Sequence, residues 1–323
     1  MAVYCRRILC ISFGITAAAV CRIPAAAAEI GEIMPSIYAH QKFGNDVLPL
    51  LPETVRKRIA EHSDLYHIGL QGPDIFFYYH PLSWGDVPKY GNRMHELSGH
   101  QFFGNALERW YGLPENTAEE QERKKAARVY LYGVLCHYTL DSSCHKFIDE
   151  TAEAGITSHA ELEGDYDRHL IAAEGRNPVC EVVTRQFHPS RSAAEAIAVF
   201  YPEMNAEIVE EALRSCVSFQ RLLLCRHDAK RNFIYAVLKL LGKYDSLHPH
   251  IMNKEPDPDC QEAERTLDGL RERACTCAVS LIIALDGRIE ETPEEEARKQ
   301  CRNFADSPEY DRDFGGTVPQ SGV

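Results

Sequence analysis

Apolar residues recur at spacings of three and four along most of the chain, which is typical of helices that bury one face. No stretch of the sequence alternates apolar and polar residues convincingly enough to indicate a sheet. The pattern therefore predicts an all-α fold, with helices over Leu51 to His62, Asn92 to Trp110, Thr117 to Glu150, Ser192 to Phe200, Ala206 to Leu224, Ala229 to Leu241 and Asp259 to Leu285.

Capping signals define where two helices begin. Thr117 is followed three residues later by Glu120, and Ser158 is followed in the same way by Glu161, so each pair forms a capping box. The second box predicts a helix that starts at His159. By contrast, the tail from Arg288 is charged and carries glycine, and we expect it to be peripheral.

The first 33 residues have the features of a secretory signal. Arg6 and Arg7 precede an apolar run from Ile8 to Val20, and Ala25 to Ala28 offers a cleavage site. The apolar run of 13 residues is too short to span a bilayer. If this leader is a working signal, the protein is exported.

We favour a second interpretation, in which translation begins at Met34 and the protein is cytoplasmic. Arg22 and Pro24 interrupt the approach to the alanines, and a purine-rich ribosome-binding stretch could encode Gly31-Glu32 just before Met34. From Met34 onward nine of the 12 cysteines remain, an odd number, and most lie inside helical patterns. They are expected to be buried thiols, which suits a reducing compartment.

The charge balance argues against one class of partner. The chain has 35 basic and 48 acidic residues, a formal net charge of −13. A stable nucleic-acid complex needs basic residues that neutralise phosphates, so we expect none here.

Histidines and carboxylates at helical spacing carry the candidate chemistry. His137, Asp141 and His145 are separated by four residues each, and so are His159 and Glu163. Residues four apart share a helix face, so each group can offer imidazole and carboxylate to one ion, and Zn²⁺ accepts both. A single such pair is usually a cap or an ion pair, but two pairs and a further histidine within 27 residues favour metal.

This arrangement resembles the zinc-dependent phospholipase C family and the related zinc-dependent single-strand nucleases. Upstream, His40 in SIYAH, Asp74 in QGPDIFFYY and His95 in RMHELSG match further metal ligands of that superfamily. His80 and His100 are alternatives to His95. The resemblance covers Met34 to Glu163 and implies an all-helical bundle, here with extra C-terminal helices.

The resemblance also implies three zinc ions. The first would be held by four residues, Asp74, His95, His137 and Asp141, and the second by His145, His159 and Glu163. Asp141 would be shared with the third ion, beside His40 and the chain's free amine. In the nuclease branch that amine lies five residues before the first histidine, which places it at Pro35.

The implied reaction is hydrolysis of a phospholipid head-group phosphodiester by a metal-activated hydroxide. Asp74 is the expected catalytic residue, orienting the nucleophile or accepting its proton. Phe76, Phe77, Tyr78 and Tyr79 nearby either line the substrate cleft or pack in the core. Two alternatives stay open, a single-strand nuclease or nucleotidase with the same site and a zinc-binding module without turnover.

These expectations give four regions and a set of partners. Residues 1–33 form the leader, 34–175 the catalytic core, 176–287 a helical continuation and 288–323 the polar tail. A phospholipid or another phosphodiester is the expected substrate, with transient contact to a membrane surface and no transmembrane segment. Asp165, Asp167 and His169 are expected on the solvent side or beside the metal ligands.

Overall fold

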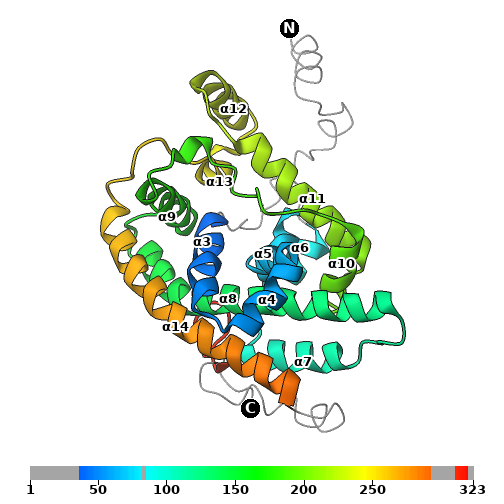
Figure 1. Ribbon diagram of the computed structural model, residues 1–323. Coiled ribbons are helices and arrows are strands. Elements are labelled where there is room, and N and C mark those ends of the chain that lie inside the picture. Colours follow the sequence, from blue (N-terminus) through cyan, green and yellow to red (C-terminus); the bar gives the residue numbers. More distant parts are fainter. Residues whose placement is uncertain (1–35, 82–84, 292–309, 319–323) are drawn as a thin grey trace, which may run out of the picture.

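A computed structural model describes residues 36–81, 85–291 and 310–318. The leader and Pro35 lie outside these residues. The described chain is all-α, as predicted, and its one β-bridge joins Ser98 and Asp313 (Figure 1). The helices are α3 (Tyr38–Val47), η1 (Leu48–Leu50), α4 (Glu53–Glu61), α5 (Ser63–Gly69), η2 (Gly72–Tyr78), α6 (Asp86–His95), α7 (Gly99–Tyr111), α8 (Ala118–Glu153), α9 (His159–Ala173), η3 (Pro178–Cys180), α10 (Arg191–Ala198), α11 (Ala206–Leu223), α12 (Asp228–Leu240), α13 (Tyr244–Leu247), η4 (His248–His250) and α14 (Gln261–Glu291).

Helix α8 is the axis of the molecule. Residues 127–142 are buried without interruption, so this part of the helix is enclosed on every side. Helix α5 approaches it so closely that a Cβ atom on Gly133 would lie 2.3 Å from the Tyr66 carbonyl oxygen. Because the two backbones touch at glycine, the segment that follows α5, which carries Asp74, lies directly against the middle of α8.

The predicted capping boxes are both present. Thr117 caps α8 together with Glu120, and Ser158 caps α9 together with Glu161. Helix α8 therefore begins where the sequence indicated, and His159 is the first residue of α9.

The predicted helix from Asn92 to Trp110 is wrong, because the structure has two helices there. Helix α6 ends at His95, and Ser98 caps α7 in a third capping box with Gln101. The Gly99 backbone N–H donates to the Arg312 carbonyl instead of continuing a helix. A local cap and a distant segment thus end α6 at a candidate ligand.

The C-terminal part of the chain differs from the expectation of a peripheral tail. Helix α14 continues to Glu291, and residues 310–318 return to pack between α7 and α8. Phe314 is fully buried and contacts Phe102 and Tyr138, with ring centroids 5.5 and 5.1 Å apart. These residues belong to the hydrophobic core.

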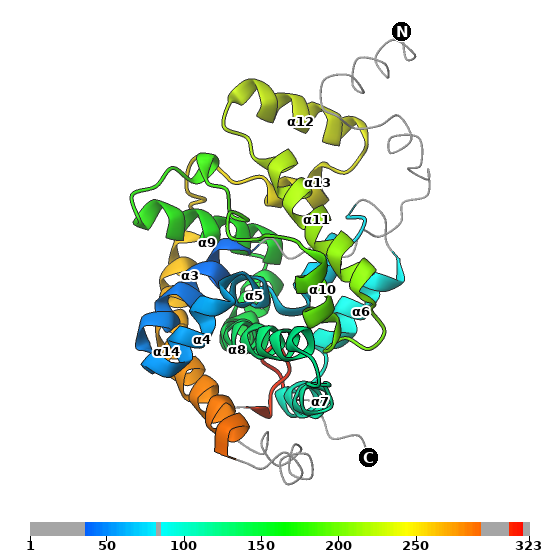
Figure 2. The same cartoon turned by 45° about the vertical axis from the view of Figure 1, so that its right-hand side comes forward.

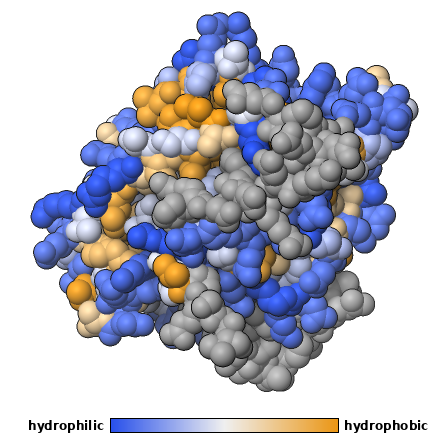
Figure 3. Space-filling model, turned by 90° about the horizontal axis from the view of Figure 1, so that it is seen from below, coloured by the Kyte–Doolittle hydropathy of each residue, from blue (hydrophilic) through white to orange (hydrophobic). Residues whose placement is uncertain are grey.

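The surface of the molecule is mostly polar, and the cysteines that the structure describes are mostly buried. Seen from below, the molecule is mainly hydrophilic, with hydrophobic residues gathered toward one side (Figure 3). Among the described helices, none combines the length and the apolar character that crossing a bilayer requires. Every cysteine in the described part of the chain is a free thiol. Five are buried, namely Cys136, Cys144, Cys216, Cys225 and Cys260, whereas Cys275 and Cys277 are only partly buried, against the expectation.

Candidate metal centre

Helix α8 supplies three candidate ligands in one stripe. His137, Asp141 and His145 follow one another at single-turn intervals, and all three are buried. The Asp141 carboxylate lies between the two imidazoles, with Oδ2 3.0 Å from His137 Nε2 and Oδ1 3.7 Å from His145 Nε2. The helical period alone brings these three groups together.

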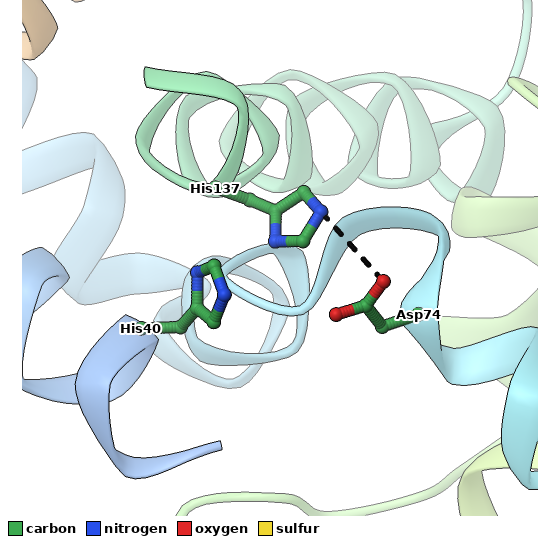
Figure 4. Close-up of side chains that lie close together, drawn as sticks. All are labelled: His40, Asp74 and His137. Carbon is green, nitrogen blue, oxygen red and sulfur yellow. Dashed lines mark ion pairs between the residues drawn. The ribbon is translucent and has the colours of Figure 1, made fainter. Parts of the chain in front are cut away.

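Two other helices bring His40 and Asp74 to the same stripe. His40 of α3 places Nε2 3.3 Å from Asp141 Oδ1. Asp74 of η2 places Oδ1 4.0 Å from His137 Nε2. In Figure 4 the side chains of His40, Asp74 and His137 point toward one another from α3, η2 and α8.

The turn before Asp74 requires glycine. Gly72 has a φ of +46°, and a Cβ atom there would lie 2.3 Å from Cδ2 of His137. Pro73 then fixes the first turn of η2. The Gly-Pro-Asp sequence therefore lets the backbone pass against His137 and aims the carboxylate at α8.

His95 is the histidine that meets Asp74. Its Nε2 lies 2.8 Å from Asp74 Oδ1, and its Nδ1 is 2.8 Å from the Gly91 carbonyl oxygen, which orients the ring. The alternatives lie elsewhere. His80 is more than half exposed beside Glu211, and His100 lies 2.6 Å from Asp311 near the surface.

Helix α9 completes the cluster from the other side. Glu163 places Oε1 3.3 Å from His159 Nε2 and 3.4 Å from His145 Nε2. The other ring nitrogen of His159 lies 2.8 Å from Asp149 of α8, which fixes the imidazole in place.

The donor atoms fit zinc in spacing and in chemistry. Tetrahedral zinc with bonds of about 2.0 to 2.1 Å separates its ligand atoms by about 3.3 Å, close to the spacings around Glu163. A cavity of about 20 Å³ lies among His40, Asp141, His145 and Glu163. Several buried atoms that could bind a metal form no hydrogen bond, namely Asp74 Oδ1, His137 Nε2, Asp141 Oδ2, His159 Nε2 and Glu163 Oε2. Such atoms need a partner, and a cation supplies it.

The electrostatics of the cluster also call for a cation. Burial, with the nearby Asp74 and Glu163 carboxylates, raises the pKa of Asp141 well above its usual range. Burial also lowers the pKa of His137 well below its usual value, and the neighbouring histidines add to this shift. A neutral His137 imidazole beside carboxylates that repel one another forms a site that bound positive charge would stabilise.

Asp167 is a supporting residue whose place the sequence did not fix. Asp167 and Asp165 are both buried, so of the two expected positions the solvent side is excluded for them and the position beside the metal ligands remains. Asp167 accepts hydrogen bonds from the backbone N–H groups of Ile37, Tyr38 and Ala39 and from the Ser36 hydroxyl. It thereby holds the N-terminus of α3, and with it His40. Its position one turn after Glu163 is the signal that could have indicated this role.

Phe314 is a second supporting residue, and no periodic pattern marks it. Its ring centroid lies 5.5 Å from that of His95 and 5.7 Å from that of His137. Its backbone N–H donates to the His95 carbonyl. Phe77 stacks on His95 at 5.5 Å, and Phe76, Phe77 and Tyr78 are buried, so these aromatic residues pack in the core.

A helical fold built around clustered histidines and carboxylates defines a class of metal-dependent proteins, and comparison with known families identifies the family. The family described as zinc dependent phospholipase C matches residues 39–212, more than half of the chain. The chain therefore belongs to this family, which confirms the resemblance seen in the sequence. The match includes all eight candidate ligand side chains, of which His40 is the first and Glu163 the last in the sequence. The family description implies a zinc-dependent hydrolase that acts on lipid. No curated protein and no solved structure matches the chain.

Proposed function

We propose that this protein is a zinc-dependent phosphodiesterase that hydrolyses the head-group phosphodiester of a phospholipid. The observation that carries the proposal is the convergence of five histidines and three carboxylates from five separate helices on one buried cluster, inside the family match. The water oxygen forms a bond to phosphorus, the bond from phosphorus to the leaving alcohol breaks, and the proton passes to that alcohol.

The proposed ligand sets follow the family pattern, and the spacing of the side chains supports them. His145, His159 and Glu163 lie together as one candidate group, and His95, His137 and Asp141 form another. His40 lies with Asp74 and His137 and also contacts Asp141. The third ion beside His40 and an amine at Pro35 rests on the family pattern, since Pro35 lies outside the described residues.

Bound zinc supplies a water of lowered pKa and positive charge beside the phosphodiester oxygens. The chain supplies orientation. The Asp74 carboxylate is buried between His95 and His137 and has an oxygen without a hydrogen bond, so it can orient the attacking water or accept its proton. Buried aromatic residues such as Phe77 and Phe314 keep bulk water away from this side of the cluster.

The first test is the zinc content and activity of protein purified without chelator. We expect about three zinc ions per chain by elemental mass spectrometry. We also expect release of phosphorylated head group from phosphatidylcholine vesicles. Cleavage of single-stranded DNA instead would favour the nuclease alternative, and zinc without turnover would favour a binding module.

The second test is Asp141→Asn, which replaces the carboxylate beside His40, His137 and His145 with a neutral amide. We expect turnover to fall by at least about 100-fold, because loss of a partner outside the ligands alone costs about 10- to 100-fold. Circular dichroism should show an intact fold. Asp86→Asn, at a fully exposed aspartate, is the matched control. Unchanged turnover in Asp141→Asn would reject the assigned site.

A further inference from the structure

Helix α12 carries an unusual outer face. Among the described residues seven large hydrophobic side chains are exposed, and three of them belong to α12 or its C-cap. Leu240 is 86% exposed, Leu241 49% and Phe233 40%. Both cartoon views place α12 at one end of the molecule, beyond α11 and α13 (Figures 1 and 2).

The exposed residues form one stripe. Successive residues of an α-helix are about 100° apart, so Phe233, Val237 and Leu240 lie on the same side of α12. Arg231 and Leu238 lie on the opposite side and are buried. A surface helix normally has one apolar face, which it buries. Helix α12 has a second apolar face, directed outward.

The segment that carries this stripe is opposite in charge to the whole chain. Residues 226–243 contain five basic residues and one acidic residue, a formal charge of +4, whereas the chain carries −13. Lys230 donates to the Leu224 carbonyl at the start of α12, and Lys239 lies over the Tyr244 ring at 4.5 Å. An outward apolar stripe on a basic helical segment is the pattern of a helix that lies in a membrane interface.

The inner side of α12 connects it to the vicinity of the metal centre. The buried Arg231 guanidinium donates to the Met252 carbonyl. Met252 borders a small cavity of about 40 Å³, together with Leu224, Gly164 and Asp167. Gly164 directly follows the candidate ligand Glu163. A surface that binds α12 would therefore lie on the side of the molecule from which this cavity approaches the cluster.

We propose that α12 docks the protein onto an anionic phospholipid bilayer, with Leu240 and Leu241 entering the interface. This inference rests on the proposed function for the nature of the substrate, but on α12 alone for the contact. The helix has 13 residues and is about 20 Å long, so it lies on a bilayer and does not span it. A second copy of the chain is a poorer partner, because two such positive faces repel each other.

Binding to vesicles tests the apolar contact. The protein as purified is sedimented with vesicles of phosphatidylcholine and phosphatidylserine, and the double variant Leu240→Asp/Leu241→Asp is compared with it. We expect the variant to bind at least about tenfold more weakly, because two leucines no longer leave water and two charges are added. Leu50→Asp, at a residue 58% exposed on η1, is the matched control and should bind normally.

The charge contribution is tested in the same assay. Lys239→Glu should weaken binding about fivefold or more, since each basic residue near an anionic surface contributes about 1 kcal/mol. Lys57→Glu, at an exposed lysine on α4, should have no effect. Raising the salt concentration or omitting phosphatidylserine should weaken binding of the unsubstituted protein in the same direction.

Two further results separate docking from turnover. Hydrolysis of a dispersed short-chain phosphatidylcholine should be unchanged in Leu240→Asp/Leu241→Asp, because α12 is outside the metal centre. Vesicle binding without any lipid turnover would support docking and reject the proposed function. Equal vesicle binding by the double variant would overturn docking, and so would a dimer that depends on Leu240 and forms without vesicle binding.

Discussion

At the scale of single residues, charged neighbours shift the pKa of individual candidate ligands. His159 lies between Glu163 and Asp149. Burial lowers the pKa of His159, but the two carboxylates outweigh it and raise the pKa from 6.5 to about 10. Burial by itself raises the pKa of Glu163, but His159 and His145 outweigh burial and lower it.

Zinc binding at this site should therefore release protons. In metal-free protein at pH 7 His159 is protonated, because its pKa of about 10 lies above the pH, and a zinc ligand must be a neutral imidazole. Each unit of pH from 7 toward 10 should strengthen zinc binding about tenfold through this group. Calorimetry in buffers of different ionisation enthalpy measures the proton release. A His159→Ala variant that releases as many protons would contradict the assignment.

At the scale of elements, the ends of helices are held by residues far away in sequence. Three backbone N–H groups at the start of α3 donate to Asp167 of α9. Three N–H groups and a hydroxyl thus share one buried carboxylate. The position of His40 depends on this contact as much as on its own helix.

Replacing Asp167 tests that dependence. We expect Asp167→Ala to lower the free energy of unfolding by at least about 2 kcal/mol, because buried backbone donors lose their acceptor. Asp167→Asn keeps one acceptor oxygen and should lose less. Urea unfolding measures the stability, and elemental analysis should show zinc lost in the alanine variant. If zinc content and stability both stay unchanged, Asp167 does not position α3.

The segment 310–318 is the second case in which a distant element supports the site. Phe314→Ala should lower the free energy of unfolding by about 3 to 5 kcal/mol, as is typical of a buried phenylalanine. Because its ring packs on His95 and His137, it should also speed the transfer of zinc to a chelator. Val318→Ala, at an exposed position of the same segment, is the control. Equal zinc release from both variants would argue against support by Phe314.

At the scale of the whole molecule, the metal centre joins helices that are otherwise separate in the sequence. Asp74, Asp141 and Glu163 come from η2, α8 and α9 and are all buried. Like charges in a core destabilise it unless cations lie between them. Bound zinc should therefore stabilise the fold as well as supply chemistry.

Removing zinc should lower Tm. An ion that binds only the folded chain stabilises it by about 4 kcal/mol when present at about 1,000 times its Kd. Calorimetry before and after chelation measures the shift, and adding zinc back should restore the original Tm whereas magnesium should not. A Tm that is indifferent to chelation would show that the cluster is stable without metal.

Periodicity in the sequence predicted the larger helices other than α7, and capping motifs predicted where two of them begin. The helices led by Thr117 and Ser158 begin as predicted, since a cap is a contact between residues three apart. The break at Ser98 was not predicted, because the helical pattern continues across it and the Arg312 carbonyl that accepts from Gly99 lies in the C-terminal segment. A helix end fixed by a distant partner leaves no periodic signal.

The sequence by itself determined the all-α class, the family and the candidate ligands within α8 and α9, because those depend on spacing along one helix. Only the tertiary structure decided that His95, and not His80 or His100, meets Asp74. It alone placed Asp167 beneath α3 and Phe314 beside His137. These contacts join residues more than 20 positions apart, and their geometry is set by how whole helices pack.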